Sequence, residues 1–321
     1  MSNYQFIKSE FEKKFNLLSI IGPTASGKTA FAANLAYFLD AEIISADSRQ
    51  VYKDMNIGTG KDYDDYIVEG KKIPYHLIDI VYAGQKYNLF NYVQDFFTVY
   101  QNIVKRDKLP ILCGGTGLYA EAIISNFDIR PVPQNQNLRK ELENKSLQEL
   151  AQILSSLKKL HNTSDIDTKK RAIRAIEIEL FYKNNPSQKT NYPHINSLNI
   201  GLKFDRELQK QKITARLQQR LNNGMIDEVK SLLDRGISSE TLIYYGLEYK
   251  FVTLYLLNQI SFEQMFQQLN IAIHQFAKRQ MTFFRHIEKQ GVEIFWIDAQ
   301  LPTTPKVQKA IDFIQNKVFS K

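Results

Sequence analysis

The chain has 321 residues, 43% of them hydrophobic, and carries 42 Lys and Arg against 34 Asp and Glu, for a formal net charge of +8. This length suits one large domain or a domain with an insertion, and this composition excludes a disordered chain. No apolar run reaches the roughly 18 residues of a membrane span. Residues 1–16 lack the pattern of a signal peptide, and the single cysteine, Cys113, excludes an internal disulfide. We expect a cytosolic globular protein whose charge favours a polyanionic partner.

The first 125 residues alternate apolar runs with helical patterns. Buried strands are predicted at 17–21, 42–46, 73–81 and 110–113, and helices at 29–39 and from Asn88 to about 104. Strands that alternate with helices favour a parallel sheet with helices on both faces. We therefore predict an α/β fold built on such a sheet.

The pattern changes near Asn126, where the apolar strands stop and Pro131 and Pro133 interrupt the chain. Helices are predicted at 138–160 and 167–182, and a polar loop follows. A strand at 199–204 then returns to the sheet, and the rest is mostly helical. We predict a helical insertion domain at 126–199 between the two parts of a core, 1–125 and 200–321.

Residues 22–29 match the phosphate-binding pattern G-x-x-x-x-G-K-[ST], placed between a predicted strand and a predicted helix. The glycines let successive backbone N–H groups face inward at the positive end of the helix dipole. Lys28 adds a point charge, and the Thr29 hydroxyl is placed to ligate Mg²⁺. The motif predicts that a diphosphate or triphosphate contacts Gly22, Pro23, Thr24, Ala25, Ser26, Gly27, Lys28 and Thr29. It does not specify which molecule carries that group.

Polar residues also stand at three other strand ends, at the edge where ligands of open α/β sheets bind. Asp47 could ligate Mg²⁺, act as a general base or cap the next helix. Thr116, in the turn Gly-Gly-Thr-Gly at 114–117, could contact a ligand or belong to a tight turn. Asp79 resembles the aspartate that holds Mg²⁺ at a strand end of P-loop proteins.

Basic residues recur at helical spacing in three places. The stripes are Lys170, Arg171 and Arg174; Lys212, Arg216 and Arg220; and Lys278, Arg279 and Arg285. A single stripe of this kind is usually a solvated helix face. Three stripes in a chain of charge +8 favour a phosphodiester backbone as the partner.

Taken together, these motifs resemble the tRNA dimethylallyltransferases. The matching blocks run along most of the chain: GPTASGKT at 22–29, DSRQVY at 47–52, IGTGK at 57–61, HLID at 76–79, GGTGLY at 114–119, KRAIRAIE at 170–177 and QFAKRQMTFFR at 275–285. Several blocks in one order are far more specific than the P-loop alone.

The resemblance implies a P-loop NTPase-like fold and a reaction in which the N6 amine of the adenosine 3′ of the anticodon (position 37) attacks dimethylallyl diphosphate, with Mg²⁺ as cofactor. It implies that Asp47 is the general base, that Thr116 contacts the target nucleotide and that Arg216 acts on the diphosphate. The anticodon stem-loop of tRNA is the expected partner of a monomeric enzyme. The tRNA contacts implied by the resemblance or expected from the basic stripes are Asp47, Ser48, Arg49, Gln50, Lys170, Arg171, Ala172, Ile173, Arg174, Lys278, Arg279 and Arg285.

The chain departs from the family pattern at three positions that we expect to contact RNA or to pack. Asp62 stands where a proline is usual, Leu247 where an aromatic residue is frequent, and His274 where an arginine is frequent.

Three other functions remain as alternatives. A small-molecule P-loop kinase would need an adenine site and a phosphate acceptor. An adenylate isopentenyltransferase would modify a free nucleotide and would not need an insertion of this length. A non-catalytic, nucleotide-switched RNA-binding protein would tolerate the loss of Asp47, whereas the enzyme would not.

Overall fold

The computed structural model describes residues 3–158, 164–186 and 190–319. The chain forms two compact units: unit 1 contains Met1–Phe127 and His194–Lys321, and unit 2 contains Asp128–Pro193. The predicted insertion at 126–199 overlaps unit 2, but its C-terminal part differs, because residues from Ser197 onward belong to the sheet of unit 1. Within the described ranges, no helix combines the length and hydropathy needed to span a bilayer.

A parallel sheet of six strands forms the centre of unit 1, counted over the described residues. In spatial order the strands are β5 (Tyr75–His76), β2 (Ala41–Ser45), β6 (Leu109–Gly114), β1 (Leu17–Ile21), β7 (Ser197–Lys203) and β8 (Phe295–Asp298). Every residue of β1, β2 and β6 is buried, as expected for parallel strands covered on both faces. The α/β fold class predicted from sequence is confirmed.

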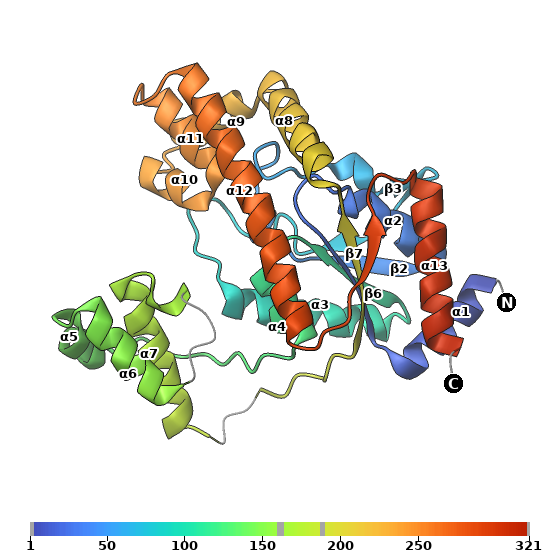
Figure 1. The fold of residues 1–321 in the computed structure, drawn as a ribbon, viewed down its shortest axis with the longest axis horizontal. Helices are drawn as coiled ribbons and strands as arrows, with labels where there is room; N and C mark the ends of the chain where they lie inside the picture. The colour runs from blue at the N-terminus through green and yellow to red at the C-terminus, as the bar shows by residue number, and fades with distance from the viewer. Residues whose placement is uncertain (1–2, 159–163, 187–189, 320–321) are drawn as a thin grey trace. The chain divides into compact units, whose positions relative to one another are not determined.

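Helices cover both faces of this sheet (Figure 1). One layer contains α1 (Asn3–Lys14), α2 (Lys28–Leu39) and α13 (Thr303–Phe319), and the other contains α3 (Leu89–Lys105) and α4 (Gly117–Ile124). The predicted start of α3 is confirmed, because the Asn88 side chain caps the helix in a capping box with Asn91.

A second set of helices packs around its own apolar core in unit 1. It contains α8 (Arg206–Asn222), α9 (Met225–Asp234), α10 (Ser239–Tyr245), α11 (Leu247–Leu256) and the first part of α12 (Phe262–Lys289). Residues from the N-terminal half of the chain, including Val51, Tyr52 and Met55, are buried in the same cluster. This shared core fixes the segment after β2 against helices more than 150 residues away in sequence.

The strand predicted at 73–81 is wrong for most of its length. Only Tyr75–His76 pair with β2. Leu77 and Asp79 adopt left-handed φ angles of 61° and 57°, and a strand cannot continue through such residues. The chain therefore turns here, and Val81 forms an isolated parallel bridge with Tyr52. A short antiparallel hairpin, β3 (Ile67–Val68) and β4 (Lys71–Lys72), and a 3₁₀ turn, η1 (Tyr63–Tyr66), precede this segment.

Unit 2 is a small helical body of α5 (Gln136–Glu143), α6 (Leu147–Leu157), η2 (Ser164–Ile166) and α7 (Lys169–Asn184). The continuous helix predicted at 138–160 is wrong, because the chain breaks at Asn144–Ser146 and Ser146 starts α6 with a capping box to Glu149. Residues 159 and 160 lie outside the described residues. The apolar seam of Leu142, Leu150, Leu154, Ala172 and Ile176 forms the core of the unit.

A buried carboxylate ties the helices of unit 2 together. Glu177 accepts hydrogen bonds from the Arg139 guanidinium at 2.9 Å, from the Asn135 backbone N–H at 2.5 Å and from Arg174. Burial alone would raise the pKa of Glu177, but these donors outweigh it and lower the pKa to about 2. The charged form therefore stabilises the fold of unit 2.

We predict that Glu177→Gln lowers the free energy of unfolding by about 2 kcal/mol at pH 7, because it removes charge-assisted hydrogen bonds. A group with a lowered pKa in the folded state stabilises at high pH and loses that effect as pH falls toward the folded pKa. The difference between wild type and variant should thus shrink between pH 4.5 and pH 2 in urea titrations followed by circular dichroism. Glu141→Gln, an exposed change on α5, is the control, and an equal loss there would contradict the assignment.

Candidate functional site

The loop between β1 and α2 has the backbone geometry of an anion-binding nest. Ala25 and Gly27 adopt left-handed φ angles of 62° and 71°, which turn successive backbone N–H groups toward one side. A Cβ at Gly27 would meet no atom within 4 Å, so the loop is open to a ligand there. Among the described residues, the buried Ser26 hydroxyl has no hydrogen-bond partner. These features, at the N-terminus of α2, fit a diphosphate.

Lys28 lies among several charges at this loop. Its Nζ donates a hydrogen bond to the Pro23 carbonyl at 3.3 Å. Desolvation lowers the pKa of the ammonium, the charges of Arg216 and Arg220 lower it further, and Asp47 acts in the opposite direction. Two of the other predicted site residues, Asp47 and Arg216, are therefore close enough to act on the charge of Lys28.

The side-chain amide of Gln280 joins the P-loop to the turn after β6. Its Oε1 accepts a hydrogen bond from the Thr24 N–H at 2.8 Å, and its Nε2 donates to the Gly115 carbonyl at 2.7 Å. The residue is buried on the face of α12 that also contains Ala277 and Phe284. Sequence reasoning missed Gln280 as a site residue, although an amide within an apolar helical stripe is an available signal.

Asp47 and Thr116 are brought together by the close approach of β2 and β6. A Cβ at Gly114 would overlap the backbone of Ala46, so only glycine allows the two strand ends to come this near. Thr116 N–H donates to the Ala46 carbonyl at 3.2 Å, and Thr116 Oγ1 accepts from the Ser48 N–H at 3.1 Å. The predicted contact threonine thus lies against the turn that carries the predicted base.

The Asp47 carboxylate shapes its own turn. Oδ1 accepts hydrogen bonds from the backbone N–H groups of Arg49 at 2.9 Å and Gln50 at 3.3 Å. The sequence suggested a helix cap, whereas the carboxylate caps a turn, and these bonds fix its position. Oδ2 takes no part in these two bonds, so capping and proton transfer are compatible roles for the same side chain.

Two arginines of α8 converge on the loop at 57–61. Their guanidinium groups lie against Gly60, where a Cβ would overlap Arg220 and come within 3.0 Å of Arg216. Desolvation lowers the pKa of Arg220, and the charge of Arg216 lowers it further. Two neighbouring guanidinium groups beside a phosphate-binding loop are well suited to an anionic ligand. Arg220 joins the predicted Arg216 here, although we had assigned it only to a basic stripe.

Each arginine has an acidic partner. Arg216 donates to Asp62 Oδ2 at 2.5 Å, and Arg220 lies 3.4 Å from Glu248 Oε1. Asp62 is one of the positions where the chain departs from the family pattern. Its carboxylate therefore engages the Arg216 guanidinium, a group that can also bind a phosphate.

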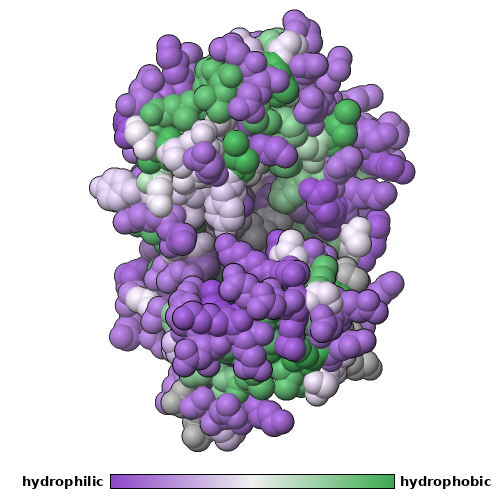
Figure 2. All heavy atoms as spheres, turned by 90° about the vertical axis from the view of Figure 1, so that its left-hand side faces the viewer, coloured by the Kyte–Doolittle hydropathy of each residue, from purple (hydrophilic) through white to green (hydrophobic). Residues whose placement is uncertain are grey.

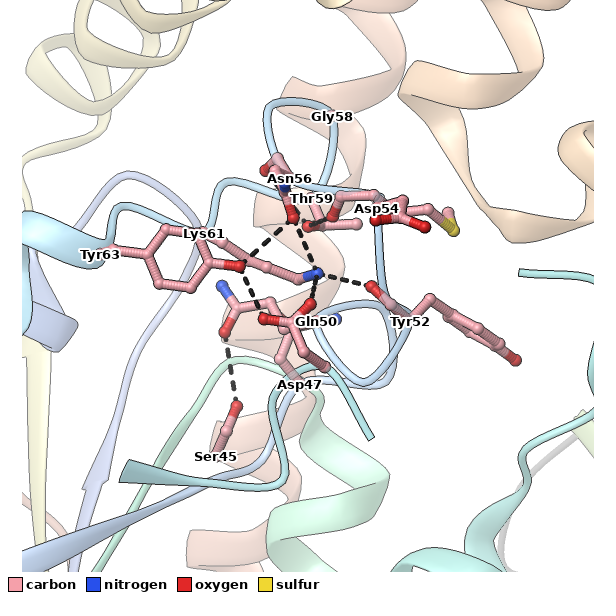
Figure 3. A network of polar contacts seen from close by, with 12 residues as sticks. Ser45, Asp47, Gln50, Tyr52, Asp54, Asn56, Gly58, Thr59, Lys61 and Tyr63 are labelled. Carbon is pink, nitrogen blue, oxygen red and sulfur yellow. Dashed lines mark hydrogen bonds and ion pairs between the residues drawn. The ribbon is translucent and has the colours of Figure 1, made fainter. Parts of the chain in front are cut away.

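The structure gives Asp79 a role other than metal binding. Its Oδ1 lies 2.5 Å from Lys61 Nζ, and its Oδ2 accepts from the Tyr63 hydroxyl at 2.6 Å. Figure 3 shows Lys61 also reaching the Tyr52 carbonyl, at 2.5 Å. Both carboxylate oxygens of Asp79 thus have a donor within the protein. No group of three or more His, Cys, Asp or Glu in the described ranges could hold a metal.

The basic residues expected to contact tRNA differ in exposure. Side chains on the surface include Lys278, Arg279 and Arg285 of α12 and Lys170 and Arg171 of α7. Ala172 is fully buried and Ile173 packs on the core of unit 2, so these two side chains contribute to the fold of that unit. Arg174 donates to Glu177 and to the Val132 carbonyl, so it contributes to the fold of unit 2.

A half-buried carboxylate from α9 holds the loop that faces the arginines. Glu228 Oε2 accepts from the N–H groups of Asn56 and Ile57, both at 2.7 Å, and Oε1 accepts from Gly58 N–H at 3.0 Å. The Tyr249 hydroxyl adds a fourth donor at 2.7 Å. Glu228 was not identified from sequence, because its partners are backbone groups more than 160 residues away.

We predict that Glu228→Gln loosens this loop, because the amide has one acceptor oxygen where the carboxylate has two. Amide hydrogen exchange at residues 56–58 should accelerate at least tenfold, and the free energy of unfolding should fall by about 2 kcal/mol. Asp227→Asn, an exposed change on the same helical turn, is the matched control. Unchanged exchange at 56–58 in Glu228→Gln would show that the carboxylate does not hold the loop.

Taken together, the parallel sheet, the nest after β1 and the polar turns at the same edge define a P-loop protein of the phosphate-binding class. The chain matches the family model described as IPP transferase over residues 50–287 and the model described as isopentenyl transferase over residues 15–76. It belongs to the IPP transferase family, as the sequence motifs predicted.

Individual relatives agree with this assignment. The chain is 58% identical over 305 residues to tRNA dimethylallyltransferase 2 of Phocaeicola vulgatus, covering 95% of this chain and 99% of the relative. It is 58% identical over 306 residues to tRNA dimethylallyltransferase 1 of Parabacteroides distasonis, covering 95% and 100%. The crystal structure of the full-length tRNA isopentenylpyrophosphate transferase from Bacillus halodurans is 32% identical, with a TM-score of 0.70 over 95% of this chain and 97% of that one.

Proposed function

We propose that the protein transfers a dimethylallyl group from dimethylallyl diphosphate to N6 of the adenosine 3′ of the anticodon (position 37) in tRNA and releases diphosphate. The observation that carries this proposal is a set of hydrogen bonds that join the P-loop to the polar turns after β6 and β2. Gln280 holds the P-loop to the turn after β6, and Thr116 holds that turn to Ala46 and Ser48, the two neighbours of Asp47. A leaving diphosphate and an incoming nucleophile would therefore meet at one rigid edge.

In this proposal the C–O bond between the allyl carbon and the diphosphate breaks while the new C–N bond forms. The P-loop N–H groups, Lys28 and Arg216 stabilise the negative charge that develops on the leaving group. The exocyclic amine is a weak nucleophile, because its lone pair is delocalised into the ring. Asp47 accepts the proton of that amine, and Thr116 orients the nucleotide. The Thr29 hydroxyl would hold Mg²⁺, which when bound would neutralise part of the diphosphate charge.

The RNA must present the adenine outside the stacked loop, because the base cannot otherwise reach a site at a strand end. We propose that Ser48, Arg49 and Gln50 contact the RNA next to Asp47. The exposed cations of α7 and α12 are proposed to contact the phosphates. We further propose a monomeric enzyme that works in the cytoplasm, where its tRNA substrate is found.

The test is transfer of label from dimethylallyl diphosphate to unmodified tRNA in the presence of Mg²⁺. Asp47→Asn should lower kcat at least 100-fold, because it removes the base, while the amide oxygen still caps the turn. Asp64→Asn, an exposed change, should keep full activity. Absence of transfer to any tRNA with adenosine 3′ of the anticodon would refute the proposal. Label on free AMP would favour the adenylate isopentenyltransferase instead.

A second prediction concerns Asp62, whose carboxylate pairs with Arg216 on the exposed side of the loop. A bound diphosphate must compete with this carboxylate for the same guanidinium. Asp62→Asn should lower KM for dimethylallyl diphosphate about two- to fivefold, the range expected for a largely exposed ion pair, with kcat little changed. A higher KM would mean instead that Asp62 orients Arg216 for the ligand. The same Asp64→Asn variant is the control.

A further inference from the structure

Two exposed tyrosines lie close to the Asp47 turn and have no role in the reaction described above. Tyr244 exposes 70% of its surface and Tyr82 exposes 59%, the two highest values among the exposed large hydrophobic side chains of the described residues. Tyr244 belongs to α10. Figure 1 draws α10 at the left, and Figure 2 shows that side of the molecule, where hydrophobic side chains lie among hydrophilic ones. Aromatic side chains are enriched in surfaces that bind a partner.

Each ring is accompanied by a cation. Arg49 Cζ lies 5.8 Å from the centroid of the Tyr244 ring, and Lys53 Nζ lies 4.2 Å from the centroid of the Tyr82 ring. Both cations come from the short segment 49–53, which begins two residues after Asp47. Within the described part of the chain, neither cation forms a salt bridge with a carboxylate. This pair of tyrosines with Arg49 and Lys53 is called the aromatic platform below.

The frame beneath the platform is rigid. Tyr245 is buried, and its ring lies 4.4 Å from that of Tyr52, centroid to centroid. The Tyr245 hydroxyl accepts from Gly84 N–H at 2.6 Å and donates to the Gln85 carbonyl at 3.2 Å. Tyr244 precedes Tyr245 directly, and Tyr82 precedes Gly84 by two residues. Both exposed rings are therefore attached to one hydrogen-bonded frame.

We propose that the aromatic platform stacks unpaired bases of the tRNA anticodon loop that neighbour the target adenosine. Exposed aromatic rings give unpaired bases a flat stacking surface, and adjacent unneutralised cations attract the phosphates between those bases. Uncompensated positive charge beside both rings favours RNA over an apolar protein partner. The position next to Asp47 places the platform beside the proposed target. The inference rests on the proposed function, since it takes the tRNA of that reaction as its ligand.

Direct RNA binding separates this inference from the proposed function. Fluorescence anisotropy with a labelled anticodon stem-loop RNA needs no turnover. Tyr244→Ala should weaken binding roughly five- to 50-fold, the range of base–aromatic stacking, and Tyr82→Ala should weaken it similarly. Tyr244→Phe keeps the ring and should bind within about twofold of wild type. Phe6→Ala removes a half-exposed ring on α1, away from the platform (Figure 1), and is the matched control.

The stacking partner is identified with RNAs that lack one loop base at a time. At the correct position, the abasic RNA and Tyr244→Ala should each weaken binding, and the combination should weaken it no further. Additive losses at every loop position would overturn the inference, even if wild-type protein transfers label to tRNA. Equal binding by Tyr244→Ala and wild type would also overturn it. A loss of self-association in Tyr244→Ala with unchanged RNA binding would mark the surface as a protein interface instead.

Discussion

The two hydrogen bonds of the Gln280 side chain hold the P-loop and the turn after β6 at a fixed separation, and the site depends on that separation. The junction has room for nothing larger than glycine at position 115, where a Cβ would lie 2.6 Å from Gln280 Nε2 and 3.3 Å from Lys28 Nζ. The same helix, α12, packs its earlier residues Leu269 and Ile273 into the second helical core of unit 1. One rigid element thus joins the helical core to the phosphate-binding edge.

Charge in this protein is divided between folding and binding. In unit 2, Arg130, Arg139 and Arg174 are engaged by carboxylates and carbonyls of the same unit. In unit 1, Arg220 is largely buried beside Gly60, whereas the cations of α12 face solvent. The count of 42 Lys and Arg therefore overstates the number of cations available to an RNA, because several of them are already paired inside the fold. Salt dependence of binding should reflect the exposed cations only.

Acidic residues hold the loop at 56–61 in place beside the cations of the site. Glu228 holds the backbone of the loop from one side, and Asp79 holds Lys61. The loop in turn provides the surface on which Arg216 and Arg220 lie. Glu228 accepts from backbone N–H groups and does not pair with the arginines. Arg216 pairs with Asp62 instead, and Arg220 pairs with Glu248.

Sequence by itself determined the α/β class, the P-loop, the strand ends with Asp47 and Thr116, and the family, because local patterns and contiguous motifs carry these features. Tertiary structure alone decided the roles of Gln280, Glu228 and Arg220, whose partners are backbone groups or charges far away in sequence. It also revealed the partners of Asp79, which are Lys61 and Tyr63. It ended the strand expected at 73–81, because residues with left-handed φ angles interrupt the apolar run there. A local pattern specifies how a segment can fold, whereas only the packing of distant segments decides which polar groups are satisfied and which remain for a ligand.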